Sequence, residues 1–324
     1  MNVLITGGAG FIGLQLVKYH INKGDMVFIL DNLYKSGLKE DIEYRELLKD
    51  NNVQFITIDL SKKISNINIS NHLDCVYHLA AINGTKLFYE IPYEVSRVNL
   101  LTTINLLDWL ENKSIDRIIY ASTSEVYAGA VNYNLVEFPT SEDVPVVFDQ
   151  PTHSRFSYAT SKFMGEFLFF HYGKKFNTDI TVLRYHNIYG PRMGNKHVIP
   201  ELIMRLNNNE NPLKLYGSTE TRSFCYISDA IEATYQVAQS PGCIGEIIHI
   251  GNSKEEIRII NLTNKLISLM GLDIRIENTS GPEASVVRRC PDTSKLKKLT
   301  GFESQIDLDE GLMQTINWYL HKNY

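Results

Sequence analysis

The stretch Val3-Leu4-Ile5-Thr6-Gly7-Gly8-Ala9-Gly10-Phe11-Ile12-Gly13 decides the fold of this 324-residue chain. It predicts a short apolar strand, a glycine-rich turn and the start of a helix, and residues 26–31 predict a second strand. The spacing Gly-x-Gly-x-x-Gly lets the chain turn tightly, lets backbone N–H groups approach a pyrophosphate, and lets the helix pack close to the sheet. Unpaired N–H groups and the helix dipole favour an anion at that helix N-terminus. We therefore predict a dinucleotide-binding unit.

The second predicted strand ends in an acid, Asp31, which stands 18 residues after Gly13. A carboxylate at this position can bind the ribose hydroxyls of NAD and repels the additional phosphate of NADP. The alternative is a glycine-rich turn in another kind of α/β protein. The strand before the turn, the helix after it and the acid favour NAD as the cofactor.

Composition and charge limit the class of protein. The chain is 44% hydrophobic and 21% charged, with a formal net charge of −5 and no block of basic residues, so we expect a globular protein that does not bind nucleic acid. No apolar run is long enough to span a membrane, and the first predicted strand leaves no room for a signal peptide, so we expect a cytoplasmic protein. The four scattered cysteines predict free thiols and no metal site.

Strands and helices alternate through the first half, which predicts a doubly wound (Rossmann) parallel sheet with helices on both faces. After Gly190 the segments shorten, which predicts a smaller mixed α/β substrate-binding lobe. We assign residues 1–185 to the NAD-binding domain, with a return to it at about 222–252, and residues 186–324 mainly to the substrate lobe. The segment 129–154 predicts a long loop that covers a site. The other predicted strands are 53–58, 75–81, 117–122, 180–185, 213–216, 223–226 and 247–250, and the other predicted helices are 92–110, 157–176, 198–206, 228–238, 259–270, 294–299 and 308–320.

Two residues that can carry chemistry, Tyr158 and Lys162, share one face of the predicted helix 157–176. A nearby ammonium group favours phenolate over phenol, and a tyrosine so activated can remove a hydroxyl proton while hydride leaves the same carbon. A Tyr-x-x-x-Lys spacing alone is common on protein surfaces. Its place after a dinucleotide turn and a fifth predicted strand favours catalysis.

Hydroxyl and carboxyl side chains follow that fifth strand directly, at Thr123, Ser124 and Glu125. The carboxyl end of a parallel strand faces the ligand crevice, where a hydroxyl can donate a hydrogen bond to the oxygen being oxidised. For Glu125, the structural alternative to catalysis is a helix N-cap or a salt bridge.

With these motifs assembled, the sequence resembles the extended short-chain dehydrogenase/reductase family, specifically its nucleotide-sugar epimerases, dehydratases and decarboxylases. Two positions depart from the family pattern, Ala128 in place of a glycine and His186 in place of a phenylalanine. The matching pieces follow the family's order over nearly the whole chain: residues 7–13, 30–33, 59–60, 78–81, Asn99, 122–127, Tyr158-x-x-x-Lys162, 187–192 and 221–224.

The resemblance implies roles for the matching positions and implies no metal. For catalysis it implies Tyr158, Lys162, Thr123, Ser124 and Glu125, with Thr123 bonding the sugar C4 hydroxyl. For NAD it implies Gly7, Gly10, Phe11, Ile12, Gly13, Asp31, Asn32, Asp59, Leu60, Leu79, Ala80, Ala81, Asn99, Tyr158, Lys162 and Tyr185. For the substrate it implies Asn187, Arg192, Val198, Tyr216, Arg222 and Arg288, with Arg289 as the alternative to Arg288.

The resemblance also implies an NAD-dependent enzyme that first oxidises a nucleotide-diphosphate sugar at C4. The string Ser-Thr-Ser-Glu-Val-Tyr resembles 4,6-dehydratases and UDP-glucuronate decarboxylases more than 4-epimerases. We lean toward a 4,6-dehydratase in which Glu125 removes the C5 proton, although Ser124 stands where many dehydratases have an aspartate. The alternatives are an NDP-sugar 4-epimerase, a UDP-glucuronate decarboxylase-like enzyme, a C4 dehydrogenase and, from another class, a non-catalytic NAD(H)-binding sensor or scaffold.

The predicted helix 157–176 is apolar on two stripes, which means that it is buried on two sides. The second side faces either a further layer of the same chain or a helix of a second subunit. Together with the predicted helix 92–110, the stripes favour a homodimer or a higher homo-oligomer. The stripes are Phe163, Phe167 and Phe170, and Phe169, Tyr172 and Phe176.

Overall fold

The structure, a computed structural model, describes residues 1–34, 42–65, 67–279 and 286–321. The chain divides into two structural units. The first comprises Met1–Val126, Gln150–Arg184 and Thr234–Ile248, and the second comprises Tyr127–Asp149, Tyr185–Ala233 and the chain from His249 onward.

This division differs in detail from the expected domains 1–185 and 186–324. Residues 127–149 belong to the second unit, because Glu142 accepts the backbone N–H of His249 at 2.9 Å and the Thr140 N–H donates to the Cys290 carbonyl at 2.8 Å. The chain returns to the first unit at Thr234, later than the expected return at about residue 222.

A seven-stranded sheet has the order β11–β6–β5–β4–β1–β2–β3. The pairs β1–β2, β2–β3, β1–β4 and β4–β5 are parallel. The strand order changes direction between β1 and β4, and doubly wound sheets bind ligands at the carboxyl ends of the strands at such a point. The predicted fold class is therefore confirmed. The strands are β1 (Asn2–Thr6), β2 (Met26–Asp31), β3 (Val53–Thr57), β4 (His72–His78), β5 (Ser114–Thr123), β6 (Asp179–Tyr185) and β11 (Ile247–Ile250).

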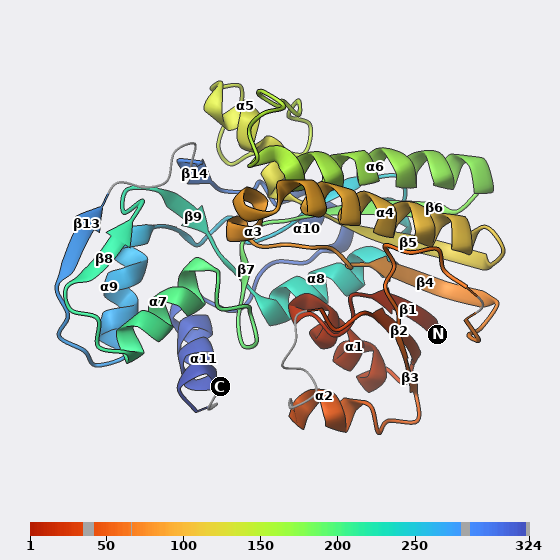
Figure 1. Ribbon diagram of the computed structural model, residues 1–324, viewed down its shortest axis with the longest axis horizontal. Helices are drawn as coiled ribbons and strands as arrows, with labels where there is room; N and C mark the ends of the chain where they lie inside the picture. The colour runs from red at the N-terminus through yellow and green to blue at the C-terminus, as the bar shows by residue number, and fades with distance from the viewer. Residues whose placement is uncertain (35–41, 66, 280–285, 322–324) are drawn as a thin grey trace. The chain divides into compact units, whose positions relative to one another are not determined.

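Helices cover both faces of this sheet (Figure 1). The helices α4 (Pro92–Leu110) and α6 (Phe156–Phe176) lie side by side on one face, and α1 (Phe11–Asn22) and α8 (Ile227–Gln239) lie on the other. The central strands are apolar on both faces, as buried parallel strands are. The main core joins side chains of the sheet to α4 and α6, among them Leu4, Val76, Leu106, Ile118 and Phe169. Three short helices were not predicted: α2 (Ile42–Leu47), α3 (Thr85–Glu90) and α5 (Ala128–Asn132), which begins the segment predicted as a long loop.

The second unit contains small sheets and several helices. Its sheets pair β7 with β10, β8 with β13, and β9 with β12 and β14. The strands are β7 (Ile188–Tyr189), β8 (Leu213–Tyr216), β9 (Thr221–Ser223), β10 (Cys225–Tyr226), β12 (Glu256–Arg258), β13 (Ile276–Thr279) and β14 (Arg288–Arg289). The helices are α5 (Ala128–Asn132), α7 (Val198–Asn207), α9 (Ile259–Leu269), α10 (Ser294–Thr300) and α11 (Leu308–His321), and two 3-10 turns elsewhere are η1 (Ser124–Tyr127) and η2 (Pro241–Cys243).

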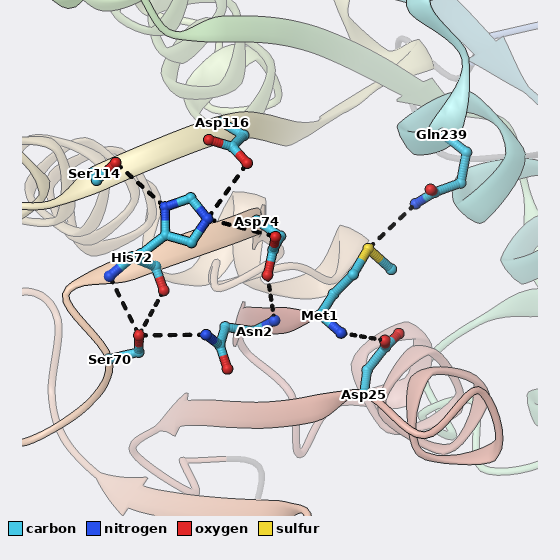
Figure 2. A network of polar contacts seen from close by, with 9 residues as sticks. All are labelled: Met1, Asn2, Asp25, Ser70, His72, Asp74, Ser114, Asp116 and Gln239. Carbon is cyan, nitrogen blue, oxygen red and sulfur yellow. Dashed lines mark hydrogen bonds and ion pairs between the residues drawn. The ribbon is translucent and has the colours of Figure 1, made fainter.

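A polar network fixes the amino ends of β1, β4 and β5 (Figure 2). The terminal ammonium group of Met1 donates to Asp25 at 2.8 Å, and Asp25 also bonds the buried His20 at 2.7 Å. The backbone N–H of Asn2 donates to Asp74, and His72 lies 3.5 Å from Asp74 and from Asp116. These contacts set the register at the end of the sheet opposite the predicted ligand-binding end.

Candidate active site

The glycine turn between β1 and α1 has the close contacts that its pattern predicts. Gly7 has φ +69°, and a Cβ there would lie 2.8 Å from the Ala80 backbone nitrogen. A Cβ at Gly13 would lie 2.2 Å from the Gly7 carbonyl oxygen, so only glycine lets α1 start this close to the turn. Gly10 is the N-cap and supplies no capping side chain. The first-turn N–H groups of α1 are therefore suited to a pyrophosphate.

The carboxylate of Asp31 lies beside this turn, at the carboxyl end of β2. It accepts the Ala9 N–H at 3.1 Å and the Leu33 N–H at 2.8 Å. The neighbouring Asn32 accepts the Tyr34 N–H at 3.0 Å. Asp59 follows β3 and accepts hydrogen bonds from the backbone and side chain of Ser61. These contacts fit the predicted placement of acids along an adenosine-binding edge.

The segment after β4, which carries Leu79, Ala80 and Ala81, is held by buried polar groups. The Thr6 hydroxyl bonds His78 Nδ1 at 2.7 Å and accepts the Ala80 N–H at 3.3 Å. β4 ends at His78, three residues earlier than predicted, so these three residues form the loop beside the glycine turn.

Asn99 on α4 was predicted to bind the cofactor, and the structure shows it engaged with the protein. Its side-chain oxygen accepts the Ile82 N–H at 2.8 Å, and its amide donates to the Ile82 carbonyl and to Ser161, each at 3.2 Å. It thus ties the loop after β4 to α6. A direct contact with NAD remains a prediction.

Tyr158 and Lys162 lie on α6 with side chains that are almost fully buried. The Tyr158 ring stacks on Phe88 with 4.8 Å between ring centroids. Burial raises the pKa of the Tyr158 phenol, and the negative charge of Glu125 raises it further, whereas a hydrogen bond from Thr123 lowers it. The chain has therefore brought the predicted base and the predicted hydroxyl donor into contact.

Lys162 loses much of its hydration in this position. Burial lowers the pKa of Lys162 to about 7, and the negative charge of Glu166 opposes that shift. Its Nζ lies 4.5 Å from the centroid of the Tyr120 ring, an arrangement in which the π face stabilises the cation. Gly165 lets the Tyr120 ring lie close to α6, because a Cβ at this position would lie 2.1 Å from the Tyr120 hydroxyl oxygen.

A buried ion pair that the sequence analysis missed lies under Lys162. Glu166 accepts hydrogen bonds from Arg184 at 2.9 and 2.7 Å and from the Ser122 hydroxyl at 2.5 Å. Glu166 and Arg184 are each only 2% exposed. The signal was present in the spacing, because Tyr158, Lys162 and Glu166 recur every four residues on one helix face.

Glu125, in η1, forms a salt bridge with Arg155, the N-cap residue of α6, at 3.2 Å. The backbone N–H of Glu125 donates to the Thr123 hydroxyl oxygen at 3.2 Å. The salt-bridge interpretation of Glu125 is thus confirmed, and the same carboxylate acts electrostatically on Tyr158. We call Thr123, Glu125, Arg155, Tyr158 and Lys162 the candidate catalytic group. The sequence analysis missed Arg155, which stands three residues before Tyr158.

In the second unit, the register of β9 and β14 decides between two arginines. Arg289 pairs with Arg222, and Arg288 pairs with Thr221. Paired residues in adjacent strands project from the same face of a sheet, so Arg289 shares the face of Arg222 and Arg288 does not. Arg288 instead forms a two-point ion pair with Glu256, at 2.7 and 2.8 Å. The register and this ion pair favour Arg289 over Arg288 as the neighbour of Arg222, and a role of either arginine in substrate binding remains a prediction.

The other predicted substrate residues also lie in this unit, apart from one another along the chain. Asn187 has φ +41° and donates to the Ser223 carbonyl at 3.0 Å, which places it beside β9. Arg192 has φ +67°. Val198 begins α7, and Tyr216 ends β8 with half of its side chain exposed. Tyr185, predicted to contact NAD, ends β6.

Among the described residues, one group of side chains brings metal-ligand atoms close together. It is His72, Asp74 and Asp116, near the amino ends of β4 and β5 (Figure 2). None of the described helices has the length and apolarity that crossing a membrane requires.

Comparisons with known proteins identify the family of this chain. The family model described as "NAD dependent epimerase/dehydratase family" matches residues 3–251. A UDP-N-acetyl-alpha-D-glucosaminuronate decarboxylase from Bacillus cytotoxicus is 35% identical, covering 98% of this chain and 97% of that protein. A UDP-glucuronate 4-epimerase from Thermodesulfobacterium geofontis is 32% identical, covering 97% and 95%. The crystal structure of UDP-glucuronic acid 4-epimerase from Bacillus cereus, in complex with UDP-glucuronic acid and NAD, has a TM-score of 0.85 at 28% identity and covers 99% of each chain.

Proposed function

Because the chain belongs to the NAD-dependent epimerase/dehydratase family, we propose that this enzyme is a decarboxylase of a UDP-hexuronate. The family membership confirms the resemblance inferred from the motifs, including an enzymatic function on a nucleotide sugar and dependence on NAD. The finer statement, loss of the sugar's C6 carboxylate as CO₂, is the proposal. It is supported by the likeness to the Bacillus cytotoxicus decarboxylase over almost the full length of both chains.

The residues around the glycine turn fit NAD. The turn itself, with Gly7 and Gly13, suits the pyrophosphate, and Asp31 suits the ribose hydroxyls. When bound, NAD accepts a hydride from C4 of the sugar and later returns it. We assign Arg222 and Arg289 to the substrate diphosphate, because a planar guanidinium matches phosphate oxygens with two parallel hydrogen bonds.

The observation that carries the oxidation at C4 is the contact of Tyr158 with Thr123, with the buried Lys162 one turn further along α6. Tyr158 takes the proton of the C4 hydroxyl, and the hydrogen bond from Thr123 favours the phenolate that this step requires. The resulting C4 ketone is β to the C6 carboxylate. The bond between C5 and C6 then breaks, its electron pair moves to the C4 oxygen as an enolate, and CO₂ leaves.

The chain's hydroxyl groups have a second task in this step. The protonated Tyr158 and Thr123 donate hydrogen bonds to the C4 oxygen as it becomes negative, which stabilises the enolate. A proton from water then adds to C5 in place of the lost carboxylate. Reduction at C4, with Tyr158 giving its proton back to the C4 oxygen, completes the cycle. No base is needed to remove a proton from C5, whereas a 4,6-dehydratase requires one.

A 4-epimerase of a UDP-hexuronate is the second candidate, supported by the 32% identical relative. The same first oxidation would then be followed by reduction on the other face of the sugar, with C6 retained. The 4,6-dehydratase toward which the sequence analysis leaned remains a prediction. Glu125 is available as its base, but Ser124 replaces the usual acid, and the relatives described above are a decarboxylase and epimerases.

Product analysis separates these candidates. The full chain with NAD is incubated with UDP-glucuronate, UDP-N-acetylglucosaminuronate, UDP-glucose and dTDP-glucose, and the products are analysed by mass and NMR. The proposal predicts loss of CO₂ from an acidic sugar. Loss of water would favour the dehydratase, and an unchanged mass with a new NMR spectrum would favour the epimerase. The Tyr158→Phe variant is the control, because it lacks only the oxygen that takes the proton.

A further inference from the structure

Arg155 is a cation inside the candidate catalytic group that the reaction at C4 does not use. It is the N-cap residue of α6 and stands three residues before Tyr158. Its guanidinium donates to a Glu125 carboxylate oxygen at 3.2 Å, and the side chain is only 9% exposed. The Glu125 side chain is 16% exposed. The pair is therefore largely shielded from water, where charge interactions are strong.

A hexuronate would bring a second carboxylate to this group. The charge of Glu125 already reaches Tyr158, because it raises the pKa of the phenol. Two carboxylates close together in a shielded site repel each other unless a cation lies between them or beside them. The group holds two basic side chains, Lys162 and Arg155. Lys162 is buried over the Tyr120 ring and next to Glu166, so Arg155 is the cation on the side of Glu125.

We propose that Arg155 selects acidic sugars by binding the C6 carboxylate of the UDP-hexuronate while it stays paired with Glu125. This inference rests on the proposed function, which supplies the acidic sugar. A guanidinium is planar and carries five N–H donors, so it can hold two carboxylates at once in fixed directions. A neutral sugar such as glucose offers no charge at C6 and gains nothing from this contact. Arg155 is thus a specificity-determining residue.

The rival interpretation is that Arg155 only orients Glu125. If Arg155 only orients Glu125, substituting Arg155 would change turnover and would affect the binding of acidic and neutral sugars to the same extent. Recognition of the carboxylate would weaken the binding of acidic sugars selectively. The ratio of two dissociation constants therefore distinguishes the interpretations without any measurement of activity.

The test measures the binding of UDP-glucuronate, UDP-glucose and UDP by calorimetry, using the full chain loaded with NAD. All variants carry Tyr158→Phe, so that no turnover occurs during the titration. Arg155→Gln removes the charge, Arg155→Lys keeps it without the planar fork, and Arg97→Gln, on the exposed side of α4, is the matched control. Thermal unfolding of each variant checks that it is folded.

We expect Arg155→Gln to weaken the binding of UDP-glucuronate by about tenfold or more, the size of one lost charge-assisted contact. The binding of UDP-glucose should weaken by less than about twofold. Arg155→Lys should fall between, and Arg97→Gln should match the parent. Glu125→Gln should tighten the binding of UDP-glucuronate, because it removes the charge that repels the sugar's carboxylate. Equal weakening of both sugars, or unchanged binding of UDP-glucuronate, would overturn the inference; if Arg155→Gln does not fold, the Arg155→Lys comparison decides.

The result is separable from the proposed function. If the wild type decarboxylates UDP-glucuronate and the binding ratio does not depend on Arg155, this inference fails alone. If UDP-glucuronate binding depends on Arg155 and the wild type retains C6, the decarboxylase proposal fails and the selection of acidic sugars stands.

Discussion

At the scale of single residues, charge around Tyr158 sets when the base is available. The carboxylate of Glu125 raises the pKa of the phenol, and only the phenolate can take the C4 proton. Glu125→Gln should therefore lower that pKa and move the rising limb of the pH–rate profile to lower pH. The measurement is the rate of NAD reduction against pH with UDP-glucuronate. A limb that stays in place, or that moves to higher pH, would contradict this electrostatic account.

Lys162 gives a second pH dependence, in stability. Burial lowers its pKa from 10.5 to about 7, so between those values the unfolded chain binds a proton that the folded chain does not. The contribution of Lys162 to the free energy of unfolding therefore rises as pH increases from about 7 toward 10.5. Lys162→Met removes the effect.

We expect Lys162→Met without NAD to unfold at a higher temperature than the wild type at pH 7, with the difference shrinking as pH rises. Thermal unfolding of both proteins across this range is the measurement, with Lys174→Met on the exposed side of α6 as the control. A difference that is constant across the range would show that Lys162 is not the group that titrates.

The same residues show what the sequence could and could not predict. Recognisable motifs contain four of them, Tyr158, Lys162, Thr123 and Glu125. The predicted topology therefore already placed these four at one site. Arg155 and Glu166 were missed because their partners lie on other elements. The spacing places Glu166 on the helix face of Tyr158 and Lys162, but it does not predict that its partner is Arg184 on β6. The choice between Arg288 and Arg289 needed the strand register.

At the scale of elements, α6 is fixed to the sheet by the Glu166–Arg184 ion pair. Removing one partner of a buried pair leaves a charge unpaired and costs about 3–5 kcal/mol, whereas replacing both is often tolerated. Glu166→Gln should therefore lower the free energy of unfolding by about 3 kcal/mol. The double variant Glu166→Met, Arg184→Met should recover much of it.

Urea denaturation of the NAD-free chain measures both variants, and Glu111→Gln, on the exposed surface, is the control. A loss below about 1 kcal/mol in Glu166→Gln, the size expected of an exposed pair, would show that the ion pair does not hold α6 in place.

Elements with a strong pattern were predicted well, and so were the short strands β8 and β11, whereas the short helices α2 and α3 were not predicted. The β1–turn–α1–β2 unit has the glycine spacing, and α6 has a long apolar periodicity. Both patterns depend on local geometry and can be recognised in the sequence. The helices α2 and α3 have six residues each, too short to be stable alone, so tertiary contacts decide them and the sequence pattern does not. β4 begins at His72, three residues before its predicted start, where the polar network of Figure 2 holds it.

At the scale of the whole molecule, the apolar residues of α6 differ in burial. Phe169 and Tyr172 are buried in the chain's own core, whereas Phe167 and Met164 are each 50% exposed. On the adjacent α4, Tyr93 is 70% exposed. Exposed apolar groups on neighbouring helices favour a partner surface. The predicted homodimer therefore stays a prediction, now assigned to the outer faces of α4 and α6.

Light scattering at micromolar concentration should show a dimer for the wild type and a monomer for Phe167→Asp, which places a charge on that surface. Lys174→Asp, also on the exposed side of α6, should remain a dimer. A wild type that is monomeric under these conditions, or a Phe167→Asp variant that stays dimeric, would contradict this assignment.

In the proposed reaction, oxidation at C4 leads to loss of C6. Its most direct test is a single incubation of the wild type and NAD with UDP-glucuronate that carries a heavy-carbon label at C6 only. The account predicts labelled CO₂ in the gas phase and an unlabelled UDP-pentose in solution. A product that keeps the label in a six-carbon UDP-sugar, with no labelled CO₂ released, would contradict it.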